Sequence, residues 1–106
     1  MKINILGTEY DYEETTSKLD IRLCSLNGYT DNYAKIIRIE KDFNENDPSS
    51  IQNFDEYKNK VRRHEIIHAV LFESGLCKES DNEMIVDWLA IQFPKLLELF
   101  KAVNCI

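Results

Sequence analysis

The chain has 106 residues, of which 43% are apolar, 30% charged and 10% aromatic. This composition is typical of globular proteins, and the length predicts a single domain over residues 1–106 with one modest hydrophobic core. Nineteen acidic and thirteen basic residues give a formal net charge of −6 without a basic stripe, which argues against a nucleic-acid partner. The sequence has no run of about 20 apolar residues, and its N-terminus turns acidic where a signal peptide is apolar, so we expect a cytoplasmic protein without a membrane partner.

The three cysteines, Cys24, Cys77 and Cys105, are odd in number, widely spaced and without a C-x-x-C pair. This spacing is typical of free thiols in a reducing compartment rather than of a disulfide framework. We therefore expect all three to serve as small buried hydrophobes.

The first 41 residues show period-two alternation, which predicts strands. Apolar and polar residues alternate over 2–6 and again over 9–13, on either side of a glycine-containing turn, as in a β-hairpin. Residues 14–27 alternate only in part and fit a short strand or a loop equally well. Residues 28–32 have turn chemistry, and residues 33–40 are rich in β-branched side chains, which predicts another strand.

Downstream of a polar loop at residues 42–50, apolar residues recur every three or four positions, which predicts helices. The first helix is expected over about 53–74, with Asn53 as its N-cap. A second helical pattern begins after Ser80 and meets Pro94, which removes an interior hydrogen bond and should kink or restart the helix. The turn between the two patterns is short enough to fold the second helix back antiparallel on the first.

The chemical signal of the sequence is H-E-x-x-H at His64-Glu65-Ile66-Ile67-His68, in the interior of the first predicted helix. Histidines at i and i+4 rise from one helix face about one turn apart and can bind one metal ion, while Glu65 can reach a metal-bound water. The chain has only two histidines, and both lie in this motif. The alternative is a structural pair of hydrogen-bonded histidines, with Glu65 a solvated helix residue.

A catalytic zinc site takes three protein ligands and leaves its fourth position to water, so the motif needs one more donor. Because the chain has no other histidine, a carboxylate must supply it. Glu83 and Asp87 lie one turn apart on the second helix; we expect Glu83 to be the third ligand and Asp87 to accept the N–H of a ligand imidazole. The alternative for Glu83 is a capping box that begins at Ser80.

His64-Glu65-x-x-His68 followed by Asn82-Glu83-x-x-x-Asp87 resembles the gluzincin signature of thermolysin-like zinc metallopeptidases, at minimal length. Over residues 61–94 the chain is similar to small phage and prophage zincin-like proteins related to the ImmA/IrrE family. The resemblance implies a zincin-like fold, a bound zinc ion, and a peptide or protein substrate. It also implies that residues 35–40 form the sheet strand beside the metal cleft, where an extended peptide can pair.

One departure from the gluzincin pattern concerns the oxyanion. Larger gluzincins place a His, Tyr or Arg beyond the third ligand to stabilise it, and none follows Glu83 here. Tyr29 or Tyr33 could substitute from the hairpin, and each also fits the role of a packed strand tyrosine.

The predicted fold class is α+β and zincin-like, with a small antiparallel N-terminal sheet packed on the H-E-x-x-H helix and a C-terminal helix that supplies a glutamate ligand. The predicted function is a zinc metalloendopeptidase of gluzincin type. His64, His68 and Glu83 are the expected ligands of Zn²⁺, and Glu65 is the expected catalytic base, taking a proton from the attacking water and delivering it to the leaving amine.

Two other function classes stay open. One is a pseudoenzyme whose zinc only stabilises a small fold, and the other is a phage regulatory module that binds a partner without cutting it. A structural zinc site would have a fourth protein ligand, such as Cys77 or Asp87, whereas a catalytic site keeps that position open. The apolar cluster at residues 96–100 predicts a homodimer if part of it lacks an intramolecular partner.

Overall fold

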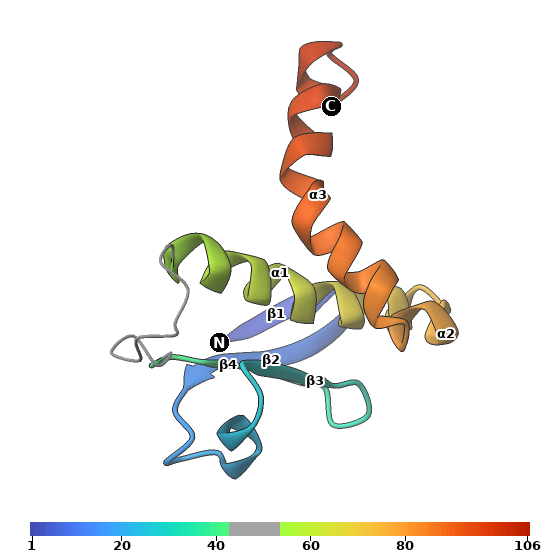
Figure 1. Cartoon of the computed structure of the whole chain (residues 1–106). Coiled ribbons are helices and arrows are strands. Elements are labelled where there is room, and N and C mark those ends of the chain that lie inside the picture. The colour runs from blue at the N-terminus through green and yellow to red at the C-terminus, as the bar shows by residue number, and fades with distance from the viewer. Residues whose placement is uncertain (43–53) are drawn as a thin grey trace.

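The computed structural model describes residues 1–42 and 54–106, where strands precede helices along the chain (Figure 1). All of the expected polar loop except Asp42, and the expected Asn53 cap, lie outside the described residues. The elements are β1 (Lys2–Ile5), β2 (Thr8–Thr15), the 3-10 helix η1 (Ile21–Cys24), β3 (Gly28–Asp31), β4 (Ile36–Glu40), α1 (Phe54–Glu73), α2 (Cys77–Ser80) and α3 (Glu83–Ala102).

The four strands form one mixed sheet in the order β1-β2-β4-β3. β1 with β2 and β3 with β4 are antiparallel pairs, and a parallel pairing of β2 with β4 joins them. The α+β class is therefore confirmed, but the expectation of an antiparallel sheet is wrong at its centre. After β2, the segment containing η1 passes over the sheet face opposite α1 (Figure 1). The chain then forms β3 and returns as β4, which lies beside β2 and runs in the same direction.

The edge strand on the side of the histidine motif is β3, not the 35–40 segment that the resemblance implied. Residues 28–31, which were expected in a turn, form this strand. The turn follows it instead, because Asp31 Oδ1 accepts the N–H groups of Tyr33 at 3.1 Å and Ala34 at 2.9 Å, and Lys35 has a φ of 60°. The strand expected at 33–40 therefore begins only at Ile36 and lies inside the sheet.

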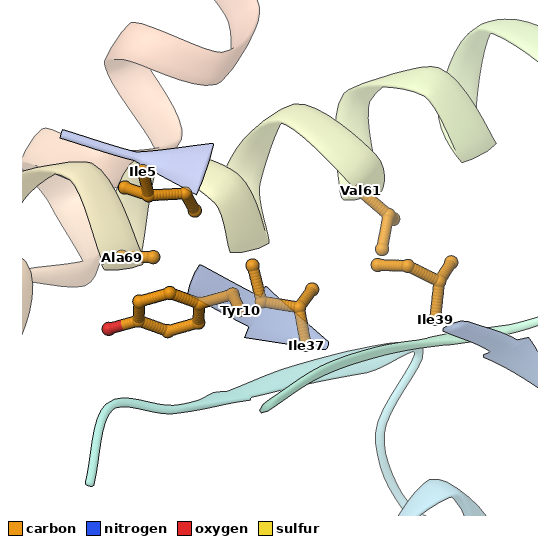
Figure 2. Close-up of a cluster of buried hydrophobic side chains, with 6 residues drawn as sticks. All are labelled: Ile5, Tyr10, Ile37, Ile39, Val61 and Ala69. Atoms are coloured by element: carbon orange, nitrogen blue, oxygen red, sulfur yellow. The ribbon is translucent and has the colours of Figure 1, made fainter. Parts of the chain in front are cut away.

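The core lies between α1 and one face of the sheet (Figure 2). Strand residues alternate between the two sheet faces, and on the face toward α1 Ile5, Tyr10, Ile37 and Ile39 are buried, while Ile3 and Tyr12 are partly buried against them. On α1 the buried positions are Val61, Glu65 and Ala69, each one turn from the next, so a carboxylate lies on the helix face that packs against the sheet. The buried apolar side chains of this cluster are Ile5, Tyr10, Ile37, Ile39, Val61 and Ala69.

The two long helices lie on the same side of the sheet, but α3 is not antiparallel to α1. α1 ends at Glu73, followed by Gly75 with a φ of 84°, a conformation that suits glycine at a helix end. After the short α2, α3 begins beside the C-terminal half of α1 and rises steeply away from the sheet (Figure 1). Its first turns pack on α1, where Val86 and Ala90 are fully buried.

Pro94 lies inside α3, which continues through it without the expected restart. A proline has no N–H to donate to the carbonyl four residues earlier, which here is that of Ala90. Arg63 of α1 replaces the missing donor, since its Nε donates to the Ala90 carbonyl oxygen at 2.7 Å. A contact between the two helices thus satisfies the carbonyl that the proline leaves open.

The expectations for the cysteines are confirmed in one respect and wrong in another. The three cysteines are free thiols, as expected, but all are exposed, so their predicted role as buried hydrophobes is wrong. Spacing in the sequence does not determine which helix or loop face a cysteine occupies.

Among residues 1–42 and 54–106, no helix combines the length and apolar character needed to cross a bilayer.

Candidate metal centre

Two histidines and a carboxylate converge where the start of α3 meets α1. The Nε2 atoms of His64 and His68 are 3.2 Å apart. The two carboxylate oxygens of Glu83 lie 2.8 Å from His64 Nε2 and 3.0 Å from His68 Nε2. One ligand atom from each residue can be chosen so that all lie within 4.8 Å of one another, which is a group that could hold a metal ion.

The position of Glu83 does not result from helix capping through Ser80. Asn82 is the N-cap of α3, and its side chain accepts the N–H groups of the next turn at 3.1 and 3.3 Å. Ser80 is fully buried, and its hydroxyl donates instead to the His68 carbonyl oxygen at 2.7 Å. The capping box is therefore absent, and the Glu83 carboxylate lies against the histidines.

The outer ring nitrogens of both histidines have acceptors. His68 Nδ1 donates to the Ser80 carbonyl oxygen at 2.5 Å, and His64 Nδ1 donates to Asp87 Oδ1 at 3.2 Å. Lys60 Nζ lies 2.5 Å from the same Asp87 oxygen, and this bond, with a smaller effect from His64, lowers the pKa of Asp87 below its ordinary value. Asp87 is thus an ionised acceptor, and both imidazoles carry their hydrogen on Nδ1.

This tautomer makes the three residues fit a divalent cation. With the hydrogen on Nδ1, the Nε2 atom of each imidazole is the one available to a metal ion, and both Nε2 atoms face the Glu83 carboxylate. Zinc bonds of about 2.0–2.2 Å place neighbouring tetrahedral donors roughly 3.3–3.6 Å apart. The two Nε2 atoms, 3.2 Å apart, are close to this spacing, whereas each Nε2 contacts a different Glu83 oxygen, at 2.8 and 3.0 Å. The Glu83 side chain, 69% exposed, would therefore shift to give one oxygen to the ion.

Glu65 lies beside the two histidines on the buried side of α1, with only 7% of its surface exposed. Its Oε1 accepts a hydrogen bond from the Thr30 hydroxyl at 3.0 Å, and the same hydroxyl also lies 2.7 Å from the Glu65 carbonyl oxygen. Burial raises the pKa of Glu65 above its ordinary value and the charge of Glu83 adds to this, while His68 and the Thr30 bond oppose it. A carboxylate with a raised pKa beside a metal-binding group can act as a general base.

Gly28 allows β3 to approach Glu65 closely. A Cβ atom at this position would lie 3.1 Å from Glu65 Cγ and 3.1 Å from the Arg38 carbonyl oxygen, tighter than nearly all real contacts. Either the Glu65 side chain or the strand would have to move to accept it. The glycine therefore keeps the Glu65 carboxylate at its place between α1 and β3.

A pocket of about 450 Å³ opens in front of the two histidines, between α1 and β3. Glu40 N–H donates to the Asn27 carbonyl oxygen at 2.8 Å, which fixes the phase of the β3–β4 pairing. Gly28 and Thr30 then direct their backbone N–H and C=O groups away from β4, toward the open edge of the sheet. Glu65, Glu83 and both of these β3 residues line the pocket.

The two tyrosines considered for the oxyanion have other contacts. Tyr29 lines the pocket, but its hydroxyl donates to Asp20, and the Arg22 guanidinium lies 4.0 Å above its ring. Tyr33, 88% exposed, stacks edge-on against Phe72 with ring centroids 5.6 Å apart and lines a neighbouring pocket. Neither hydroxyl therefore donates into the pocket in front of the histidines.

The structure brings together the five site residues expected from the sequence, His64, Glu65, His68, Glu83 and Asp87, whereas four further residues around them were missed. The Ser80 carbonyl accepts from His68 Nδ1, and Lys60 pairs with Asp87. Thr30 donates to Glu65, and Gly28 leaves room for its side chain. The Ser80 carbonyl is a backbone group and leaves no mark in the sequence. A lysine four residues before the first histidine was a detectable signal, since positions i and i+4 share a helix face.

Comparison with protein-family models, with curated proteins and with solved structures finds no match to this chain.

Proposed function

We propose that the chain is a zinc-dependent metalloendopeptidase of gluzincin type, acting on a peptide or protein substrate. In this proposal His64, His68 and Glu83 hold Zn²⁺, Glu65 is the general base, and Asp87 orients His64. The observation that carries the proposal is that two Nε2 atoms and the Glu83 carboxylate converge next to Glu65. Glu65, although mostly buried, lines the same pocket as these three residues. Two histidines and a carboxylate are a donor set of catalytic zinc sites.

A zinc ion bound to these residues would supply a Lewis acid that polarises a substrate carbonyl and increases the acidity of water. The remaining chemistry belongs to the chain. Glu65 Oε1 is held by Thr30, which leaves Oε2 to take a proton from the attacking water and to deliver it to the leaving amine. The open backbone groups of Gly28 and Thr30 offer an extended segment hydrogen bonds beside Glu65.

The number of protein donors supports a catalytic rather than a structural zinc. Within the described ranges, the group that could hold a metal comprises His64, His68 and Glu83. Cys77 is exposed and lines the neighbouring pocket, and Asp87 contacts the far nitrogen of His64. Three protein donors leave one tetrahedral position for water, whereas a structural site is closed by a fourth.

One observation favours a second candidate, a metal-binding module that binds a partner without hydrolysing it. A peptidase gains from a donor aimed at the developing oxyanion, and the Tyr29 hydroxyl at this pocket is bonded to Asp20 instead. The second candidate and the peptidase share the same metal ligands. They differ only in turnover.

The test measures zinc and hydrolysis on the same purified protein. We expect one zinc per chain by elemental analysis, cleavage of members of a proteome-derived peptide mixture by mass spectrometry, loss of cleavage with a chelator and recovery with zinc. One zinc per chain without any cleavage would favour the non-hydrolytic module. Absence of zinc from the purified protein at neutral pH would contradict both the peptidase and the metal-binding module.

A further inference from the structure

A second pocket continues the groove beyond the metal centre. It has a volume of about 440 Å³ and shares Tyr29, Thr30 and Asp81 with the pocket in front of the histidines. The two pockets therefore form one groove along β3, with the metal centre at one end. Its far end is lined by Tyr33 and Phe72.

The far end is aromatic and open. Tyr33 has a large aromatic side chain and is nevertheless 88% exposed. Its ring packs edge-on against that of Phe72. Rings of this kind provide a wall for an aliphatic side-chain stem and an electron-rich face for a cation. The groove already shows this type of contact, since the Arg22 guanidinium lies over the Tyr29 ring.

One charge in this pocket has no partner among the described residues. Arg22 pairs with Asp31 at 3.6 Å, and Asp31 also accepts backbone N–H groups. Lys35, near the Phe72 ring, pairs with Glu73 at 2.8 Å. The exposed Asp81 follows α2 and lines both pockets, and within residues 1–42 and 54–106 no side-chain bond engages its carboxylate.

From these observations we infer that Asp81, Tyr33 and Phe72 form a subsite for the lysine or arginine side chain of a bound peptide segment. The aliphatic stem of such a residue packs against the two rings, and its cationic head pairs with Asp81. The inference rests on the proposed function in one respect, namely that the segment extends along β3 to the metal centre. The excess of acidic residues in the chain favours the approach of a basic peptide.

The test compares two acetylated and amidated pentapeptides that differ only at the central residue, arginine or its uncharged isostere citrulline. Each is titrated into the ¹⁵N-labelled full chain carrying Glu65→Gln, loaded with zinc, at low ionic strength. We expect shifts of the Thr30, Tyr33 and Asp81 amides. The arginine peptide should bind about fivefold more tightly, the upper range for a solvent-exposed ion pair.

Two variants assign this preference. Asp81→Asn should bring the two affinities together, while Glu98→Gln removes one exposed carboxylate from the distal half of α3 and should leave the ratio unchanged. Zinc content of each sample confirms that the metal centre is intact. The subsite would be overturned if the Glu65→Gln chain bound the two peptides equally tightly or bound neither. It would also be overturned if the arginine preference survived Asp81→Asn.

The outcome is separable from that of the proposed function. An arginine preference that depends on Asp81, in a protein whose parent form cleaves no peptide, would leave the subsite standing and remove the peptidase. Cleavage without an Asp81-dependent preference would do the reverse.

Discussion

The two histidines can bind a metal together because their outer nitrogens are already engaged. The Ser80 carbonyl fixes the ring of His68, and Asp87 fixes the ring of His64. Both Nε2 lone pairs then point to one position, which the Glu83 carboxylate also reaches. Spacing alone brings two imidazoles to one helix face, but these acceptors select the tautomer that binds.

The first prediction concerns the three proposed ligands. His64→Ala, His68→Ala and Glu83→Ala should each abolish stoichiometric zinc binding, because three protein ligands are the usual minimum for tight catalytic zinc. The measurement is zinc per chain after dialysis, with Glu98→Ala on the same helix as the control. Full zinc content in Glu83→Ala would show that another group is the third ligand.

The second prediction concerns Asp87. Asp87→Ala should weaken zinc affinity by roughly 10–100-fold, the range for a residue that orients a metal ligand, without abolishing binding. The measurement is competition with a chromophoric chelator. Because Lys60 also contacts this carboxylate, Lys60→Met serves as the companion variant. An Asp87→Ala affinity equal to that of the parent would reduce the contact with His64 to a surface ion pair.

The side chains of the site could be predicted from the sequence, but the groups that support them could not. His64, Glu65 and His68 follow from i,i+4 geometry, and Glu83 from the need for a carboxylate. Thr30 and Gly28 lie far from the motif in the chain, and only the pairing of β3 places them against Glu65. Such contacts depend on tertiary structure, which no local pattern encodes.

At the scale of elements, the contact between α1 and α3 explains why α3 continues through a proline. Pro94 leaves the carbonyl of the buried Ala90 without its helical donor, and Arg63 provides the replacement. The sequence alone predicted a kink or a restart at Pro94, and the restart is absent because another helix supplies the donor. The same contact holds the start of α3, and with it Glu83, next to α1.

The third prediction is a coupling between Arg63 and Pro94. Arg63→Met should lower the free energy of unfolding by about 1–3 kcal/mol, since it leaves a buried carbonyl unsatisfied. In a Pro94→Ala background the new N–H can satisfy that carbonyl, and the cost of Arg63→Met should fall by about 1 kcal/mol. Urea unfolding of the four metal-free proteins measures the cycle. Equal costs in both backgrounds would mean that the Arg63 bond does not replace the missing donor.

The strands show a related limit of prediction. Alternation in the sequence identified β1, β2 and the region of β4, because burial of one sheet face imposes period two. It could not show that β2 pairs with β4 in parallel, since edge pairing depends on the path of the intervening segment. The turn-forming residue types at 28–32 also led to the wrong prediction of a turn where β3 lies. Gly28 allows β3 to approach Glu65 closely and does not form a turn.

At the scale of the whole molecule, the distal half of α3 projects from the body (Figure 1). The helix face that buries Val86 and Ala90 continues through Phe93, Leu97 and Phe100, at spacings of three and four. Phe93 is 48% exposed and Phe100 is 41% exposed. An apolar face of this kind suits a second copy of the same helix.

The fourth prediction is therefore concentration-dependent homodimerisation through this face. Light scattering should show a mass that approaches twice the 12.5 kDa of the chain as concentration rises. Phe100→Glu should weaken association at least about tenfold, because it places a charge where the dimer would bury an apolar side chain. Ile91→Glu, at a position of similar exposure on the opposite helix face, should leave it unchanged. A constant monomer mass would contradict this prediction.

Glu65→Gln tests whether the site is a peptidase centre with Glu65 as its base. The amide is nearly isosteric with the carboxylate, can still accept the Thr30 hydrogen bond, and is not one of the proposed ligands. The measurement is the rate of peptide cleavage together with zinc per chain, for the parent and the variant prepared in parallel.

If Glu65 is the base, the two proteins should have equal zinc content, and the cleavage rate of the variant should fall by roughly 10²–10⁴, the contribution of a positioned general base. Equal cleavage rates at equal zinc content would contradict this role of Glu65.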